Sequence, residues 1–96
     1  MAEYRLTPAA EKDLETIWNY TGDRWGVEQA NLYIDALSAA FAELAKAPEH
    51  APSCQHIRPG YRRWSIERHV IYLRKTEYGI AVVRILHNRM DALRHI

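Results

Sequence analysis

The chain has 96 residues, of which 48% are hydrophobic and 26% charged, and its net charge is +1 at neutral pH. This length and balance predict one domain over residues 1–96 and exclude a disordered polymer or a two-domain protein. A single cysteine excludes an internal disulfide, and the sequence has neither a signal-peptide pattern nor an apolar run of membrane-spanning length. A cytoplasmic protein without membrane contact is therefore predicted.

The first half of the sequence predicts a strand followed by two helices. Alternation in Tyr4-Arg5-Leu6 indicates a short strand, and Thr7-Pro8 is typical of a helix start, with a hydroxyl N-cap before a proline. This helix should end before Gly26, which supplies a turn. A second helix is predicted from about residue 27 to 47, where an apolar stripe at helical spacing ends before Pro48.

The second half predicts three strands joined by tight turns. After a loop over residues 48–59, strands are expected at 61–66, 69–74 and 80–87, followed by a short helical turn over 88–96. The last strand is almost wholly apolar, so it should be central and covered on both faces, with the first strand beside it. The order β-α-α-β-β-β predicts an α+β fold, with an N-terminal strand and a helical hairpin packed on a mainly antiparallel four-stranded sheet.

Positive charge is concentrated in the second half. Residues 1–50 carry nine acidic and four basic side chains, whereas residues 51–96 carry three acidic and nine basic ones. Such a basic face suits an acidic protein surface or a phosphate backbone, although a solvated sheet face beside acidic helices gives the same pattern. The cluster comprises Arg62, Arg63, Arg84, His87, Arg89, Arg94 and His95.

Arg84 stands in the middle of the apolar last strand, where a charge is costly unless it has a partner or reaches solvent. Two interpretations stay open: a structural salt bridge, for instance to Glu67 or Asp91, or an arginine that recognises a binding partner. His87 is three residues further on, so it should point to the opposite face of the strand. This spacing argues against a simple acid–base pair.

Motifs for metal, cofactor and covalent chemistry are absent from the sequence. The histidines and cysteine of residues 50–56 lack the spacing of zinc ligands, and neither a glycine-rich phosphate loop nor a nucleophile motif occurs. No metal site and no cofactor are therefore predicted. Trp18, Trp25 and Trp64 are core residues or anchors for a partner, and the position of Trp25 beside the turn glycine suits the second interpretation.

Several groups of residues along the chain resemble ParE toxins of the RelE/ParE superfamily. In the first half these are Tyr4-Arg5-Leu6-Thr7-Pro8-x-Ala10, Asp13-Leu14-x-x-Ile17-Trp18-x-Tyr20 and Trp25-Gly26-x-x-x-Ala30-x-x-Tyr33. In the second half they are Arg58-x-Gly60-Tyr61-Arg62, the region of His69, Ile71 and Tyr72, and Val83-Arg84-Ile85-Leu86-His87-x-x-Met90-Asp91-x-x-x-His95. The resemblance covers nearly the whole chain, and its parts are in the family's order.

This resemblance implies the toxin of a type II toxin–antitoxin pair. Toxins of the family are encoded with a ParD-type antitoxin, whose flexible C-terminal segment wraps over the toxin, and the free toxin inhibits DNA gyrase. The antitoxin, alone or in complex, represses its own operon, so contact with DNA would be indirect. We therefore expect a hetero-oligomer with the antitoxin, and a protein-binding inhibitor without enzyme activity.

The related RelE branch consists of ribosome-dependent mRNA endonucleases and supplies the alternative. Metal-free RNA cleavage needs an acid or base and cations for the phosphate. Part of such a set is retained here, as Arg62, Arg63, Arg84 and His87. However, Lys75 is the only lysine of the sheet region, no tyrosine lies near the C-terminus, and the ending Met90-Asp91-x-x-x-His95 favours ParE. A third interpretation is an inactive interaction module.

Two contact surfaces are expected, and no catalytic residue is assigned. Gyrase contacts are predicted on the basic sheet face and tail, at Arg84, His87, Arg89, Met90, Arg94 and His95. Antitoxin contacts are predicted on the apolar hairpin surface and an open sheet edge, at Trp18, Trp25, Tyr33, Leu37, Arg62 and Trp64.

Overall fold

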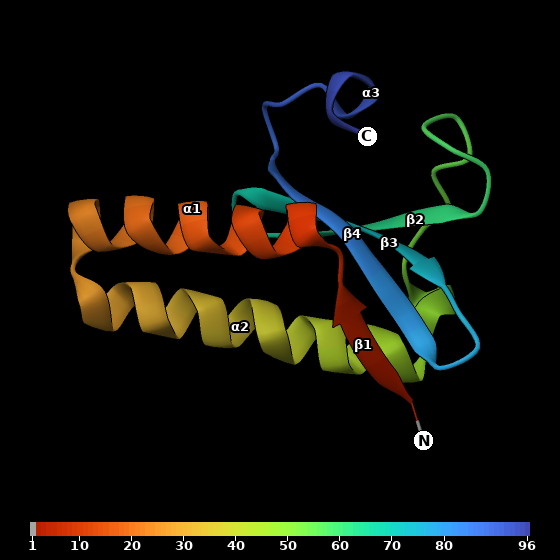
Figure 1. Cartoon of the computed structure of the whole chain (residues 1–96), viewed down its shortest axis with the longest axis horizontal. Coiled ribbons are helices and arrows are strands. Elements are labelled where there is room, and N and C mark those ends of the chain that lie inside the picture. Colours follow the sequence, from red (N-terminus) through yellow and green to blue (C-terminus); the bar gives the residue numbers. More distant parts are fainter. Residues whose placement is uncertain (1) are drawn as a thin grey trace.

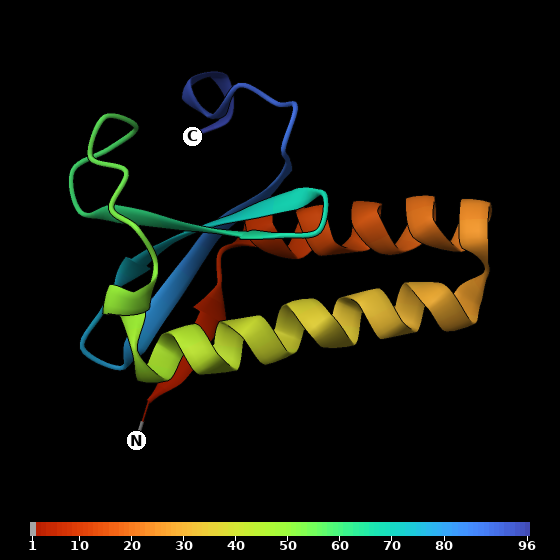
Figure 2. The same cartoon turned by 180° about the vertical axis from the view of Figure 1, so that it is seen from behind.

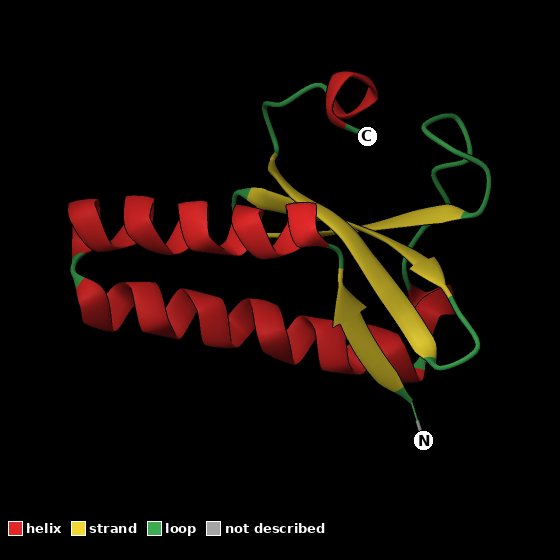
Figure 3. Cartoon of the chain, viewed as in Figure 1, coloured by secondary structure: helices red, strands yellow, loops and turns green. Residues whose placement is uncertain are grey.

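The computed structural model describes residues 2–96 and consists of a helical hairpin beside a four-stranded sheet. Strand β1 (Glu3–Leu6) leads into helices α1 (Pro8–Trp25) and α2 (Val27–Lys46). A short 3-10 turn, η1 (Pro48–His50), then precedes β2 (Tyr61–Ile66), β3 (His69–Lys75), β4 (Gly79–His87) and the short helix α3 (Ala92–His95). The order predicted from the sequence is confirmed, and η1 lies within the segment that was predicted as loop (Figures 1 and 3).

The two long helices begin and end at the residues that their sequence indicates. Thr7 is the N-cap of α1, because its hydroxyl accepts a hydrogen bond from the Ala10 amide at 3.1 Å, and Pro8 occupies the first turn. Gly26 joins α1 to α2 with a φ of 93°, a conformation that side chains other than glycine disfavour. The hairpin is therefore fixed by local chemistry at both ends of α1.

The sheet has the strand order β1-β4-β3-β2. β1 runs parallel to β4, whereas β4 with β3 and β3 with β2 are antiparallel pairs. The predicted position of the first strand beside the last one is confirmed, and β4 is a central strand. The sheet is mixed, with antiparallel pairing in two of its three ladders.

A β-bulge in β4 decides which of its side chains face the helices. Tyr72 pairs with Arg84, but the next residue, Leu73, pairs with Val82, so Val83 is an extra residue in the ladder. Strict alternation would place Val82 and Ile85 on opposite faces of the sheet. The bulge shifts the chain after Val83 by one position relative to β3, so Val82 and Ile85 both face the hairpin.

The two faces of the sheet carry separate hydrophobic clusters. The face toward the hairpin contains Ile17, Leu37, Phe41, Val82 and Ile85. The other face is covered by the loop before β2 and by α3, and its cluster consists of Cys54, Val70, Tyr72, Leu86 and Ala92. The prediction that β4 is covered on both faces is confirmed.

The turn end of the hairpin projects beyond the sheet, as Figures 1 and 2 show. Four large apolar side chains on this projecting part are more than half exposed: Tyr20 (56%), Trp25 (60%), Val27 (56%) and Leu32 (62%). The sheet covers only the other half of the hairpin, so this end lacks an intramolecular cover. Over residues 2–96, neither long helix is apolar enough along its length to cross a membrane.

Candidate functional site

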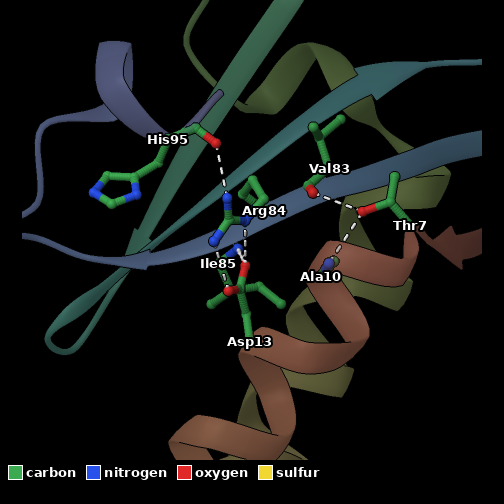
Figure 4. A network of polar contacts seen from close by, with 7 residues as sticks. All are labelled: Thr7, Ala10, Asp13, Val83, Arg84, Ile85 and His95. Carbon is green, nitrogen blue, oxygen red and sulfur yellow. Dashed lines mark hydrogen bonds and ion pairs between the residues drawn. The ribbon is translucent and has the colours of Figure 1, made fainter.

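Arg84 is held by a bidentate ion pair with Asp13 of α1. The Arg84 Nε and Nη2 atoms donate to the Asp13 Oδ2 and Oδ1 atoms at 2.8 and 2.9 Å. The remaining Nη1 atom donates to the His95 carbonyl in α3 at 2.7 Å. The hydrogen bond to Asp13 raises the pKa of Arg84 above its ordinary value. One arginine therefore joins the first helix, the central strand and the C-terminal helix (Figure 4).

This network replaces a missing strand. β1 ends at Leu6, so, among residues 2–96, the edge of β4 beyond Val82 lacks a strand partner on that side. The Thr7 hydroxyl donates to the Val83 carbonyl at 2.7 Å, and the Ile85 amide donates to Asp13 at 2.9 Å. The first turns of α1 thus satisfy backbone groups that would otherwise be left unpaired at the sheet edge.

The salt bridge predicted for Arg84 exists, but the expected partners, Glu67 and Asp91, were wrong. Asp13 lies 71 residues away in sequence, on helix α1. Only 23% of the Arg84 side chain and 14% of the Asp13 side chain are exposed. The structural interpretation of Arg84 is therefore supported, and its guanidinium is engaged within the fold.

A second polar cluster lies on the face of the sheet toward the hairpin. The Tyr33 hydroxyl of α2 is 2.6 Å from the His69 Nδ1 atom of β3. His69 pairs across the strands with His87, and the two rings meet edge to face with centroids 5.5 Å apart. The Arg89 amide lies 3.2 Å from the His87 Nδ1 atom. Three side chains from three elements thus form a connected group, which we call the histidine cluster: Tyr33, His69 and His87.

Burial changes the proton affinity of the histidine cluster. Desolvation, with the neighbouring His87 as the next cause, lowers the pKa of His69 from 6.5 to about 4. Desolvation also raises the pKa of Tyr33 above its ordinary value. Both side chains are therefore neutral near pH 7.

The histidine cluster lines a cavity of about 570 Å³ between the hairpin and the end of the sheet. Its apolar walls include Ile17, Tyr20, Trp25, Ile85 and Met90. Glu67 and Arg68, from the turn between β2 and β3, also line it. This volume lies within the range of about 300–1,000 Å³ that ligand pockets occupy.

The candidates for gyrase contact fall into two groups. Arg89, Met90, Arg94 and His95 are exposed on the segment that follows β4. Arg84 is engaged with Asp13, and His87 is half-buried in the cavity. As predicted, Arg84 and His87 lie on opposite faces of the sheet, since Arg84 pairs with Tyr72 of the α3-side cluster and His87 reaches the cavity.

The candidates for antitoxin contact are scattered and differ in accessibility. Trp25 and Trp64 are 60% and 39% exposed. Half-buried Trp18 donates to Asn31, and half-buried Arg62 donates to the Ala51 carbonyl. Tyr33 lies in the cavity.

Leu37 is the one antitoxin candidate that the structure contradicts. Its side chain is completely buried, in the cluster between the hairpin and the sheet. Helical spacing identified its stripe correctly, but the same spacing describes a core residue and a contact residue. The prediction of a direct antitoxin contact at Leu37 is therefore wrong for this fold.

Sequence reasoning did not identify the histidine cluster or the exposed apolar residues Tyr20 and Leu32 of the hairpin. His69 resembled a strand-start residue, and its proximity to Tyr33 depends on how α2 crosses the sheet. Tyr20 and Leu32 carried a signal that could have been used, because both are large apolar residues outside the buried stripes of their helices.

Comparison with known proteins gives a consistent result over the whole chain. The sequence model of the family described as "ParE toxin of type II toxin-antitoxin system, parDE" matches residues 4–92. The chain is 46% identical to "Toxin ParE1" of Mycobacterium tuberculosis (strain ATCC 25618 / H37Rv), over 99% of this chain and 98% of that protein. It is 38% identical to "Toxin ParE1" of Caulobacter vibrioides, over 100% and 99% of the two chains.

A solved structure agrees in fold. It is titled "Chromosomal ParDE TA system from P. aeruginosa", and it superposes with a TM-score of 0.77 over 91% of this chain and 96% of that one. The sequence identity of 20% makes this a comparison of architecture. The helical hairpin and the mixed sheet are therefore shared well beyond recognisable sequence similarity.

Proposed function

Because the chain belongs to the ParE toxin family of parDE type II toxin–antitoxin systems, we propose that it inhibits DNA gyrase and is neutralised by a ParD-type antitoxin. The observation that carries this proposal is the family match over residues 4–92, which includes both the hairpin and the C-terminal strand. The toxin forms a hetero-oligomer with its antitoxin, and the free toxin meets gyrase in the bacterial cytoplasm. DNA is reached only through the antitoxin complex.

The geometry around β4 supports a protein-binding inhibitor over an endonuclease. A metal-free nuclease needs a cation and a proton-transfer group that converge on one phosphate. Here Arg84 forms a bidentate pair with Asp13, and His87 lines the cavity. The cation that the endonuclease interpretation required is thus already paired with a carboxylate.

The exposed segment after β4 is the gyrase-contact surface of this proposal. Arg89, Met90, Arg94 and His95 all reach solvent there, and Met90 is 47% exposed. Arg84 fixes the position of α3 in this surface, because its Nη1 atom donates to the His95 carbonyl. The exposed arginines suit an acidic protein surface.

The test is a gyrase supercoiling assay with purified toxin, run beside an mRNA cleavage assay on translating ribosomes. We expect inhibited supercoiling and intact mRNA. Charge reversal at two exposed positions, Arg89→Glu with Arg94→Glu, should weaken inhibition by about tenfold or more. Lys46→Glu is the matched control, since its side chain is 68% exposed at the end of α2, and it should inhibit like the original chain.

Three other outcomes would contradict parts of this proposal. Cleaved mRNA with untouched gyrase would move the chain to endonuclease activity. Full inhibition by the double variant would exclude the segment after β4 as the contact surface. A chain that affects neither assay and leaves growth unchanged when expressed without antitoxin would be an inactive interaction module.

A further inference from the structure

Each ring of the histidine pair uses one nitrogen within the fold. The Tyr33 hydroxyl lies 2.6 Å from the His69 Nδ1 atom and donates to the Ile66 carbonyl at 3.4 Å, so the phenol oxygen is also able to accept from Nδ1 when that atom carries a proton. The His87 Nδ1 atom faces the Arg89 amide, which can only donate. In the neutral His87 ring, Nδ1 is therefore an acceptor and the proton resides on Nε2, whereas the His69 Nε2 atom carries a proton whenever that ring is charged.

The Nε2 atoms of both rings are open to the cavity. Within residues 2–96, the hydrogen bonds of these rings involve only their Nδ1 atoms. The one buried side-chain polar atom without a partner in that range is the Thr76 hydroxyl, so neither Nε2 atom is sealed from solvent. Since both histidines line the cavity, it holds two ring nitrogens that the fold leaves unused.

The charges around the cavity favour an acceptor over a donor as the missing group. Asp13, its first acid, is neutralised by Arg84, and Arg68 brings a guanidinium. Glu67 is the remaining acid, and it lies exposed on a turn. Within residues 2–96, no set of three or more metal-ligating side chains is assembled, so a metal ion does not explain the histidine pair.

The walls require an apolar neighbour for that acceptor. Trp25 and Tyr20 form the outer rim and are more than half exposed, whereas Ile17 and Ile85 form the buried floor. An occupant that covers these side chains removes apolar surface from water at about 25 cal/mol per Å². A carboxylate flanked by apolar residues supplies both the hydrogen-bond acceptor and the apolar cover, whereas an inorganic anion supplies only the acceptor.

We propose that this cavity receives an Asp or Glu side chain, flanked by apolar residues, from the antitoxin, and that the Nε2–H groups of His69 and His87 hold its carboxylate. The inference rests on the proposed function for the identity of the partner. It adds the chemistry of the contact: a neutral His87 donor and a His69 ring that donates once it is protonated, inside an apolar rim. Hydrogen bonds to a charged group contribute more than neutral ones, and a water-poor cavity strengthens them.

Binding of a carboxylate there takes up a proton. A negative charge next to His69 stabilises its charged form and raises its pKa from about 4, so the complex binds more protons than the free toxin. Affinity therefore increases as the pH falls, by roughly threefold to tenfold between pH 8 and pH 5.5. The charged and titratable groups that face His69 from the packed elements are Asp13, Tyr33, Glu67, Arg68 and His87.

The first experiment measures affinity for the full-length cognate ParD-type antitoxin by calorimetry. His69→Phe and His87→Phe each keep a ring but lose the donor, and each should bind about tenfold to a hundredfold more weakly. The pH dependence should flatten in both. His56→Gln, on an exposed loop away from the cavity, is the matched control and should bind like the original chain.

A second experiment does not depend on the antitoxin. Ring-proton NMR of the full chain, titrated with 3-phenylpropionate, should raise the pKa of His69, whereas the neutral 3-phenylpropanamide should not. Wild-type antitoxin affinity in both Phe variants, or a His69 pKa unchanged by the carboxylate, would overturn the inference. Dimerisation of the toxin that both variants abolish would assign the cavity to a second copy and would equally overturn it.

The two experiments separate this inference from the proposed function. If the antitoxin does not bind but 3-phenylpropionate shifts His69, the cavity chemistry stands and the partner assignment fails. If the antitoxin binds and gyrase is inhibited, but neither histidine variant changes the affinity, the function stands and the inference fails.

Discussion

Two polar clusters flank β4, and they differ in how completely their hydrogen bonds are satisfied. Around Arg84, six hydrogen bonds join Thr7, Asp13 and Arg84 to one another and to their neighbours at 2.7 to 3.1 Å. In the histidine cluster, each ring keeps one nitrogen open to a cavity. The network around Arg84, which we call the closed cluster, has the features of a structural contact. The histidine cluster, which we also call the open cluster, has the features of a binding site. Both contain residues that the sequence predicts as partner contacts.

The difference follows from where each cluster lies relative to the hairpin. Asp13 belongs to the part of α1 that packs on the sheet, so its carboxylate is close to the edge of β4. Tyr33 lines the cavity together with Tyr20 and Trp25, which belong to the projecting end of the hairpin. A polar group at the packed end can be satisfied internally, whereas one at the projecting end has a cavity beside it.

The largest expected effect comes from breaking the closed cluster. Asp13→Ala removes the acceptor of three hydrogen bonds and leaves the largely buried Arg84 charge without a partner. We expect a loss of about 3 kcal/mol in the free energy of unfolding, measured by urea denaturation. Replacing both partners, Asp13→Leu with Arg84→Met, should cost less than the single change, because no buried charge is orphaned.

Glu15→Ala is the matched control for this prediction, since Glu15 is an exposed acid on the same helix. It should change the free energy of unfolding by less than about 0.5 kcal/mol. A loss below 1 kcal/mol for Asp13→Ala, or equal losses at both positions, would show that the closed cluster contributes little to stability.

The fold could be predicted almost completely from local signals. The N-cap at Thr7, the turn at Gly26 and the apolar run of β4 each encode their element within a few neighbouring residues. The partner of Arg84 could not be predicted, because it depends on β1 ending before β4 does and on the bulge at Val83. Neither feature has a signature in the residues that surround Arg84.

The next largest effect is the pH dependence of stability that arises from His69 in the open cluster. His69 takes up a proton near pH 6.5 in the unfolded chain but only near pH 4 in the fold. Between these values the unfolded state binds more protons, so the free energy of unfolding falls as the pH is lowered through that window. We expect this histidine to account for a loss of about 2 kcal/mol, after allowance for solvent screening.

Urea denaturation at pH 7 and at pH 4 measures this loss. In His69→Gln the position no longer titrates, so the drop in stability between the two pH values should be smaller by about 2 kcal/mol than in the original chain. His56→Gln should leave the drop unchanged, because this side chain is exposed on a loop. Identical drops in the original chain and His69→Gln would mean that His69 protonates as easily in the fold as outside it.

The candidate site was less predictable than the fold for a physical reason. Trp25 and Leu37 both occupy apolar positions of the hairpin, yet one is 60% exposed and the other is fully buried. Their difference arises from where the sheet ends, which no periodicity within a helix reports. The histidine cluster likewise brings α2, β3 and β4 together, so its members are neighbours only after the sheet has formed.

The smallest expected effect on stability is at the rim of the open cluster. Trp25 has 60% of its surface in water, so Trp25→Ala should change the free energy of unfolding by less than about 0.5 kcal/mol. The same substitution should weaken antitoxin binding by about tenfold or more, because an exposed tryptophan at the edge of an apolar cavity gains most of its burial in a complex. Trp64→Ala, on the edge strand β2, is measured in the same calorimetric titration. Comparison of the two variants shows whether the antitoxin contacts the hairpin, the edge strand or both. A large stability loss for Trp25→Ala would make this residue part of the scaffold, and the projecting end would then belong with the closed cluster and not with the open one.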